Sequence, residues 1–234
     1  MAGPLTSVFR KRDLTSGSLA GNLFHLAAPL AVGAALHALY GIVDAFWLGR
    51  FGAHAITAPG VSLPFLFIVI SLGMGFGHAG TPLVAQHTGA GRHQDAYHVA
   101  GQILLLLCVL AGVMALPAVV FAPQLLALAR VKDGVAVIAV PYLRIVMLGI
   151  PLTALAIGYG SVLRALGNSI TPVLIAVCSN IFNALLDPVL IFGLGGFPRL
   201  GATGAALATL ASQVCAALVC LVLIKRRHAG LQIG

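Results

Sequence analysis

The sequence contains very few charged residues. Asp, Glu, Lys and Arg together make up 8% of the 234 residues, and glutamate is absent altogether. A soluble domain of ordinary composition carries charge on about a quarter of its residues. The composition therefore argues against a water-soluble globular domain. Hydrophobic residues account for 60% of the chain, and its mean hydropathy is +1.06.

Long uncharged runs recur along the chain, and each can cross a hydrocarbon core, which takes about 20 helical residues. They cover residues 14–43, 51–91, 96–129, 145–163 and 200–224. This pattern predicts an all-α polytopic membrane protein with six transmembrane helices. We expect the helices at about 22–48, 57–84, 96–121, 136–160, 170–194 and 201–224.

The chain is expected to divide into a tail over 1–20, a six-helix unit over 21–225 and a basic tail over 226–234. An even number of helices puts both termini on one side of the lipid bilayer. The basic tail segments 10–12 and 225–227 lie on that side, so the positive-inside rule predicts cytoplasmic termini. These tails also account for much of the net charge of +8, and no basic groove with interleaved aromatic residues indicates nucleic-acid binding.

Few residues suit metal or enzyme chemistry. The four cysteines lie in apolar runs without metal-like spacing, which is typical of small core residues. There is no paired nucleophile and base, so an intramembrane enzyme is disfavoured, and no cofactor is expected apart from a coupling ion. Trp47 and Tyr142 are interpreted as anchors at the membrane interface.

Two of the five aspartates, Asp44 and Asp187, lie inside predicted spans. A charge near the bilayer centre costs at least about 2.5–3.5 kcal/mol on insertion scales, so such residues persist where they face a cavity, a partner or an ion. A simpler interpretation of Asp44 is a carboxylate at a helix end near the interface, because Gly49 and Arg50 follow it closely.

Asp187 belongs to the stretch "NIFNALLDP", which also contains Asn180 and Asn183. Their i, i+3, i+7 spacing gives one polar stripe on a helix. Helices 22–48 and 170–194 run in the same direction, and each aspartate lies shortly before the far end. The helix over 201–224 returns from that end, so Thr209 reaches a similar depth.

These five residues are therefore expected to meet in one layer of the bundle. Carboxylate, amide and hydroxyl oxygens suit a hard cation such as Na⁺. Two desolvated carboxylates close together can carry a proton instead. A third interpretation is that the asparagines only hydrogen-bond neighbouring helices.

Four motifs resemble the multidrug and toxic compound extrusion (MATE) family, in the order in which that family has them. They are "APLAVGAALHALYGIVDAFWLGRFG", "GTPLVAQHTGAGR", "YLRIVMLGIPLTAL" with "GYGSVLRALGNSITP", and "NALLDPVLIFGLGG" with "LGATGAALAT". The resemblance covers nearly all of residues 20–225.

The resemblance implies the N-terminal six-helix lobe of a twelve-helix transporter, which would need a C-terminal lobe or a second copy. Such transporters sit in the plasma membrane (the bacterial inner membrane) and export organic cations, drugs or metabolites in exchange for Na⁺ or H⁺. Residue by residue, the resemblance assigns the cation site to Asp44, Asn183, Asp187 and Thr209. It assigns the bend of the first helix to Pro29, while His37 and Tyr40 are candidates for the substrate cavity. His37 and Ala45 depart from the residues common in the family.

Two alternatives remain open at this point. One is a lipid-linked flippase of the same superfamily, which would need cationic residues in its cavity to hold pyrophosphate. The only arginine embedded in a predicted helix is Arg144, near an end. The other is a truncated remnant that does not transport.

Overall fold

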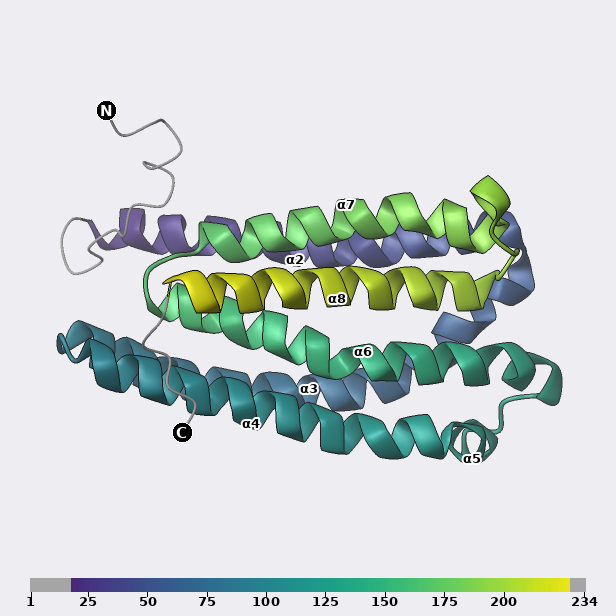
Figure 1. The fold of residues 1–234 in the computed structure, drawn as a ribbon, viewed down its shortest axis with the longest axis horizontal. Coiled ribbons are helices and arrows are strands. Elements are labelled where there is room, and N and C mark those ends of the chain that lie inside the picture. The colour runs from purple at the N-terminus through teal and green to yellow at the C-terminus, as the bar shows by residue number, and fades with distance from the viewer. Residues whose placement is uncertain (1–17, 228–234) are drawn as a thin grey trace.

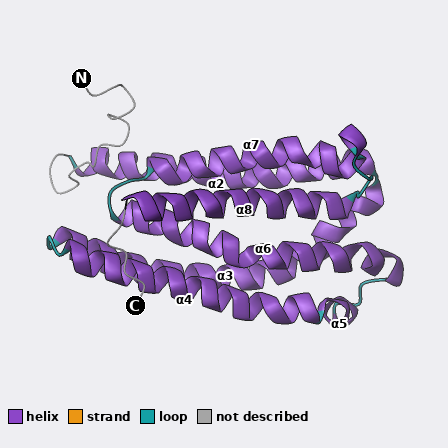
Figure 2. Cartoon of the chain, viewed as in Figure 1, coloured by secondary structure: helices purple, strands orange, loops and turns teal. Residues whose placement is uncertain are grey.

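The computed structural model describes residues 18–227, which form helices and short connections without a strand (Figures 1 and 2). A short helix, α5 (Ala122–Leu128), and a 3₁₀ turn, η1 (Leu194–Gly196), accompany six long helices. The long helices are α2 (Leu19–Phe51), α3 (Ala53–Gly89), α4 (His93–Val120), α6 (Asp133–Ala165), α7 (Ile170–Phe192) and α8 (Ala202–Arg227). The predicted tails lie mostly outside the described residues.

All six predicted helices are present, and each is long and apolar enough to cross a membrane. Most extend past the predicted ends, and α6 covers 133–165 where 136–160 was expected. Hydropathy marks only the apolar middle of a helix, whereas its backbone hydrogen bonds continue into polar ends. Helix α5 was not predicted. It begins next to Pro123, a residue well suited to the first turn of a helix.

Gly193 ends α7 in a left-handed conformation, with φ 73° and ψ 41°. A Cβ at this position would lie 2.5 Å from the carbonyl oxygen of Phe197, so only glycine fits. The chain then turns back, and the amide of Gly201 donates to the carbonyl of Ile191 across 3.2 Å. This tight reversal makes α7 and α8 antiparallel neighbours.

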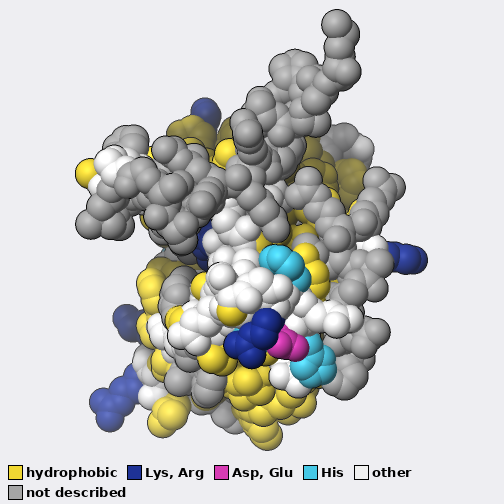
Figure 3. Space-filling model, turned by 90° about the vertical axis from the view of Figure 1, so that its left-hand side faces the viewer, with side chains coloured by type: hydrophobic (Ala, Val, Ile, Leu, Met, Phe, Trp, Pro, Cys, Tyr) yellow, Lys and Arg dark blue, Asp and Glu magenta, His cyan; other side chains and the backbone are white. Residues whose placement is uncertain are grey.

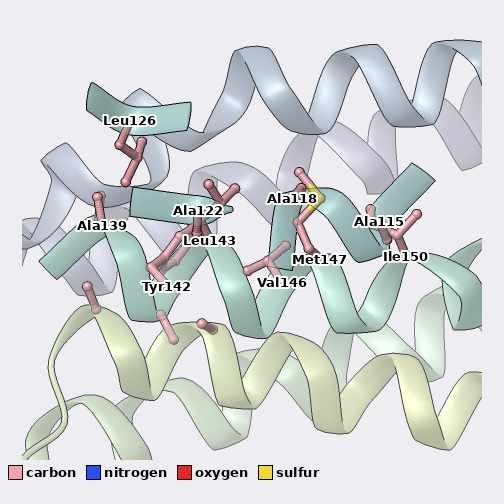
Figure 4. Packing of buried hydrophobic residues seen from close by; sticks show 14 of the residues in the cluster. Ala115, Ala118, Ala122, Leu126, Ala139, Tyr142, Leu143, Val146, Met147 and Ile150 are labelled. Carbon is pink, nitrogen blue, oxygen red and sulfur yellow. The ribbon is translucent and has the colours of Figure 1, made fainter. Parts of the chain in front are cut away.

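The helices form two groups, with α2, α7 and α8 together and α3, α4 and α6 together (Figure 1). Helix α6 packs against α3, α4 and α8, and therefore joins the groups. Figure 4 shows Ala115 and Ala118 of α4 beside Met147 and Ile150 of α6. The small alanines let the two backbones approach closely, as is common in membrane helices.

Much of the outer surface of the bundle is apolar. Ile42, Phe67, Val113 and Leu185 are each more than 60% exposed. In water such a surface would be unfavourable, but it suits hydrocarbon. Charged and histidine side chains gather at the end of the bundle drawn in Figure 3. The described residues thus have the polarity of an integral membrane protein.

Candidate functional site

The candidate site is built from three helices. Helix α2 supplies Asp44, α7 supplies Asn183 and Asp187 one turn apart, and α8 supplies Thr209. These helices pack together because α7 contacts both α2 and α8. Asp187 is 0% exposed, Asn183 1% and Thr209 6%. Of the two carboxyls, which are the most expensive groups to bury in a membrane, Asp187 is therefore completely buried, while Asp44 is half-buried with its Oδ1 inside the bundle.

The buried side chains interact across the helices. The Asp44 carboxyl lies near the carboxyl of Asp187 and the hydroxyl of Thr209. The amide of Asn183 donates a hydrogen bond of 3.4 Å to Oδ1 of Asp187. The structure therefore brings Asp44, Asn183, Asp187 and Thr209 together, as the depths of the predicted helices indicated. We call these four residues the acidic cluster.

Several oxygens of this region have no hydrogen-bond partner among the described residues. They are Asp44 Oδ1, Asn183 Oδ1, Asp187 Oδ2, Thr209 Oγ1 and Tyr40 Oη. Buried polar atoms are normally paired, and an unpaired one costs about 1–3 kcal/mol. Four of the five come from the acidic cluster. A group of unpaired oxygens fits a hard cation or a proton as the missing partner.

The atoms of the cluster also indicate which kind of metal ion they suit. Among the side chains that the structure describes, no three or more His, Cys, Asp or Glu residues form a group that could hold a metal ion. The unpaired atoms of the cluster are all oxygens, from two carboxyls, an amide and a hydroxyl. Ligands of this type favour hard cations over zinc or copper.

Tyr40 lies one turn before Asp44 on α2, near Thr209 and Ser212 of α8. It is therefore adjacent to the acidic cluster. Its predicted role in the substrate cavity stays a prediction. Pro29 and His37 also fall on α2, but their side chains are outside the described part of the structure. The predicted hinge and one substrate-cavity candidate therefore stay predictions.

Asn180 has a different environment from the other residues of its stripe. Its amide donates a 2.9 Å hydrogen bond to the backbone carbonyl of Leu36 on α2. This bond holds α7 to α2, as expected of an asparagine that joins helices. Its amide therefore contacts the backbone of a neighbouring helix, and its role as a cation ligand stays a prediction.

Tyr142 is the residue that sequence reasoning misplaced. It was interpreted as an interface anchor, but it is 6% exposed and belongs to the buried core, within electrostatic range of Asp44 and Asp187. That interpretation rested on residue type, because tyrosine is common at membrane interfaces. Since α6 begins at Asp133, Tyr142 lies nine residues, or about 14 Å, into the helix.

Six apolar helices, three of which enclose a group of carboxyl, amide and hydroxyl side chains, define a polytopic helical membrane protein. The MatE family model matches residues 29–189, so the chain belongs to this family of MATE transporters.

Curated relatives support the family. The chain is 32% identical over 205 residues to "Probable multidrug resistance protein YoeA" of Bacillus subtilis (strain 168), an alignment that covers 87% of this chain and 44% of that protein. It is 28% identical over 219 residues to "FAD transporter" of Shewanella oneidensis, with 93% and 48% covered. The chain spans about half the length of the curated relatives it matches.

Solved structures give the same picture. The chain superimposes on "Crystal structure of MATE in the straight conformation" with a TM-score of 0.81 and 26% identity, covering 94% of this chain and 48% of that one. A MOP superfamily transporter from Pyrococcus furiosus matches with a TM-score of 0.83 and 25% identity, over 92% and 47%. The described helices correspond to about half of a MATE transporter, the extent of one lobe.

Proposed function

We propose that this chain is the N-terminal lobe of an antiporter that exports organic cations, drugs or metabolites in exchange for Na⁺ or H⁺. In this proposal it sits in the bacterial inner membrane with both termini in the cytoplasm, and its partner is a C-terminal lobe or a second copy. The observation that carries the proposal is the set of unpaired oxygens of Asp44, Asn183, Asp187 and Thr209 in the interior of three packed membrane helices.

The coupling follows from where these oxygens lie. A carboxylate in this interior is stable when a cation or a proton neutralises it. An empty, charged cluster would favour a rearrangement of α2 against α7 and α8, and this rearrangement is the proposed step that drives substrate out. The names of the relatives differ in cargo, "multidrug" in one case and "FAD" in another. A substrate panel should therefore contain a cationic dye and a flavin.

The flippase alternative has less support. The groups that interact with Asp44 and Asp187 include no lysine or arginine among the described residues. Arg144 instead donates to the backbone carbonyl of Val119 at the end of α4, across 3.1 Å. A cavity for pyrophosphate would need cationic donors close to the cluster.

Ion binding can be measured on the purified chain, because Trp47 is its one tryptophan and lies one turn after Asp44. Its ring packs against Phe192 of α7 at a centroid distance of 6.1 Å, so its fluorescence should report changes between α2 and α7. Na⁺ would be titrated at constant ionic strength, with choline as the compensating ion, and pH would be varied separately.

Asp44→Asn and Asp187→Asn should each weaken the response at least tenfold. Losing a charged contact of about 1.5–3 kcal/mol corresponds to this factor. The matched control is Asp133→Asn, which removes an aspartate from the first turn of α6 and should leave the response unchanged. A Trp47 response to neither Na⁺ nor pH would refute the coupling role. In cells, both cluster variants should abolish efflux by the transporter while leaving membrane insertion intact.

A further inference from the structure

A groove of about 290 Å³ lies between α7 and α8, outside the acidic cluster. Its walls are mostly apolar and include Leu174 of α7 with Val219 and Leu223 of α8. Two of the four cysteines, Cys178 and Cys215, also line it, one from each helix. Both are exposed, whereas Cys220 is buried and Cys108 is half-buried.

The two thiols lie at similar depth along the helix pair. Ser179 Oγ donates to the carbonyl of Ser212 across 3.2 Å, and this bond fixes the antiparallel register of α7 and α8. Cys178 precedes Ser179 by one residue on α7, and Cys215 follows Ser212 by three residues on α8. Because the helices are antiparallel, both steps lead toward the same end of the bundle. At 1.5 Å per residue the axial offset is about 3 Å. The thiols therefore face one groove from opposite helices at nearly one level.

We propose that Cys178 and Cys215 form a dithiol site for a soft, thiophilic group, such as a trivalent arsenical, that bridges their two sulphurs. Soft thiolate ligands select soft metals and metalloids, and two neighbouring thiols hold such a group far more tightly than one. The apolar walls favour an organic arsenical over a hydrated ion. Neither cysteine belongs to the acidic cluster, so the site is separate from the proposed cation site.

The reaction is balanced without an oxidant. An arsenoxide, R–As=O, meets two thiols, and two As–S bonds replace the As=O bond. The two thiol protons leave with the oxygen as one water molecule, and arsenic stays trivalent. The product ties α7 to α8. Because these helices carry Asn183, Asp187 and Thr209, the bridge is expected to reduce the Trp47 response to the coupling ion.

The test uses phenylarsine oxide on the whole purified chain, with intact mass spectrometry as the readout. The wild type should gain one phenylarsine group with loss of one water, and the adduct should survive excess monothiol but be released by a dithiol. Cys178→Ser and Cys215→Ser should each lose this stable adduct. The matched controls, Cys108→Ser and Cys220→Ser, should keep it.

Three outcomes would overturn the proposal: an adduct that monothiols remove from the wild type, a stable adduct retained in either groove variant, or a bridge that joins two chains. Cys178→Ala and Cys215→Ala repeat the test with a second side chain, and Trp47 emission checks that each variant is folded. Because mass alone reports the bridge, its formation can be judged even if the proposed ion coupling fails.

Discussion

The spacing between α7 and α8 is open to a direct test at Gly204. A Cβ at this position would lie 2.6 Å from the carbonyl carbon of Leu190 on α7 and closer still to its oxygen, while ordinary contact begins at 3.4 Å. Backbone atoms cannot rotate away as a side chain can. In Gly204→Ala the helices must therefore separate locally by at least about 0.8 Å, the difference between these two distances.

Overpacking of this kind costs about 1–3 kcal/mol, and the higher helix propensity of alanine returns up to about 1 kcal/mol. Because the overlap is with backbone, the upper part of this range applies, and the net cost is about 1–2 kcal/mol. At about 2–4 °C per kcal/mol for a chain of this size, we expect the Tm to fall by roughly 2–8 °C. Thermal unfolding in detergent, followed by Trp47 fluorescence, measures the shift. The matched control is Gly112→Ala on α4, where an added Cβ has no neighbour within 4 Å. That variant should be unchanged or slightly more stable.

The same separation should weaken ion binding. Thr209 lies five residues after Gly204 on α8, or about 7.5 Å along the helix. Ion–ligand distances must hold to about 0.2 Å, so a movement of about 0.8 Å at this range should lower the apparent Na⁺ affinity several-fold. A Gly204→Ala variant with wild-type Tm would refute the packing argument. Lower stability with unchanged ion affinity would show that the cluster does not depend on this contact.

Two further substitutions test single hydrogen bonds. Asn180→Ala removes the hydrogen bond to Leu36 O, which should lower the free energy of unfolding by about 0.6–1.7 kcal/mol. The Na⁺ affinity should stay within about threefold of the wild type. A tenfold loss of affinity would instead identify Asn180 as a ligand. Arg144→Met removes the bond to Val119 O, a carbonyl whose ordinary helical donor would be residue 123, a proline without an N–H. Thermal unfolding should show a loss of about 1.5 kcal/mol, against no comparable change in Arg92→Met, whose contact with Asp95 is exposed.

Much of the fold and most of the site could be predicted because charge is so rare in this chain. In an apolar sequence, Asp44 and Asp187 stand out, and counting residues from the helix ends placed them at one depth with Asn183 and Thr209. Tyr142 did not stand out, since tyrosine is common at membrane interfaces and its residue type does not say whether the side chain faces lipid or the interior of the bundle. The sequence also could not predict that Cys178 and Cys215 line the same groove. This arrangement depends on the register of α7 against α8, which the bond between Ser179 and Ser212 fixes and no local pattern encodes.

The two perturbations of the α7–α8 pair act from opposite ends of the acidic cluster. Gly204 precedes Thr209 by five residues, and Cys215 follows it by six, so their distances along α8 are about 7.5 and 9 Å. If the spacing of the whole pair sets the ligand positions, Gly204→Ala and the arsenical bridge should both weaken the Trp47 response to Na⁺. If only Gly204→Ala does so, the cluster is positioned by the tight reversal after Gly193, and the groove end of the pair moves independently. Gly112→Ala should leave the response intact in either case, because α4 contributes none of the four residues of the cluster.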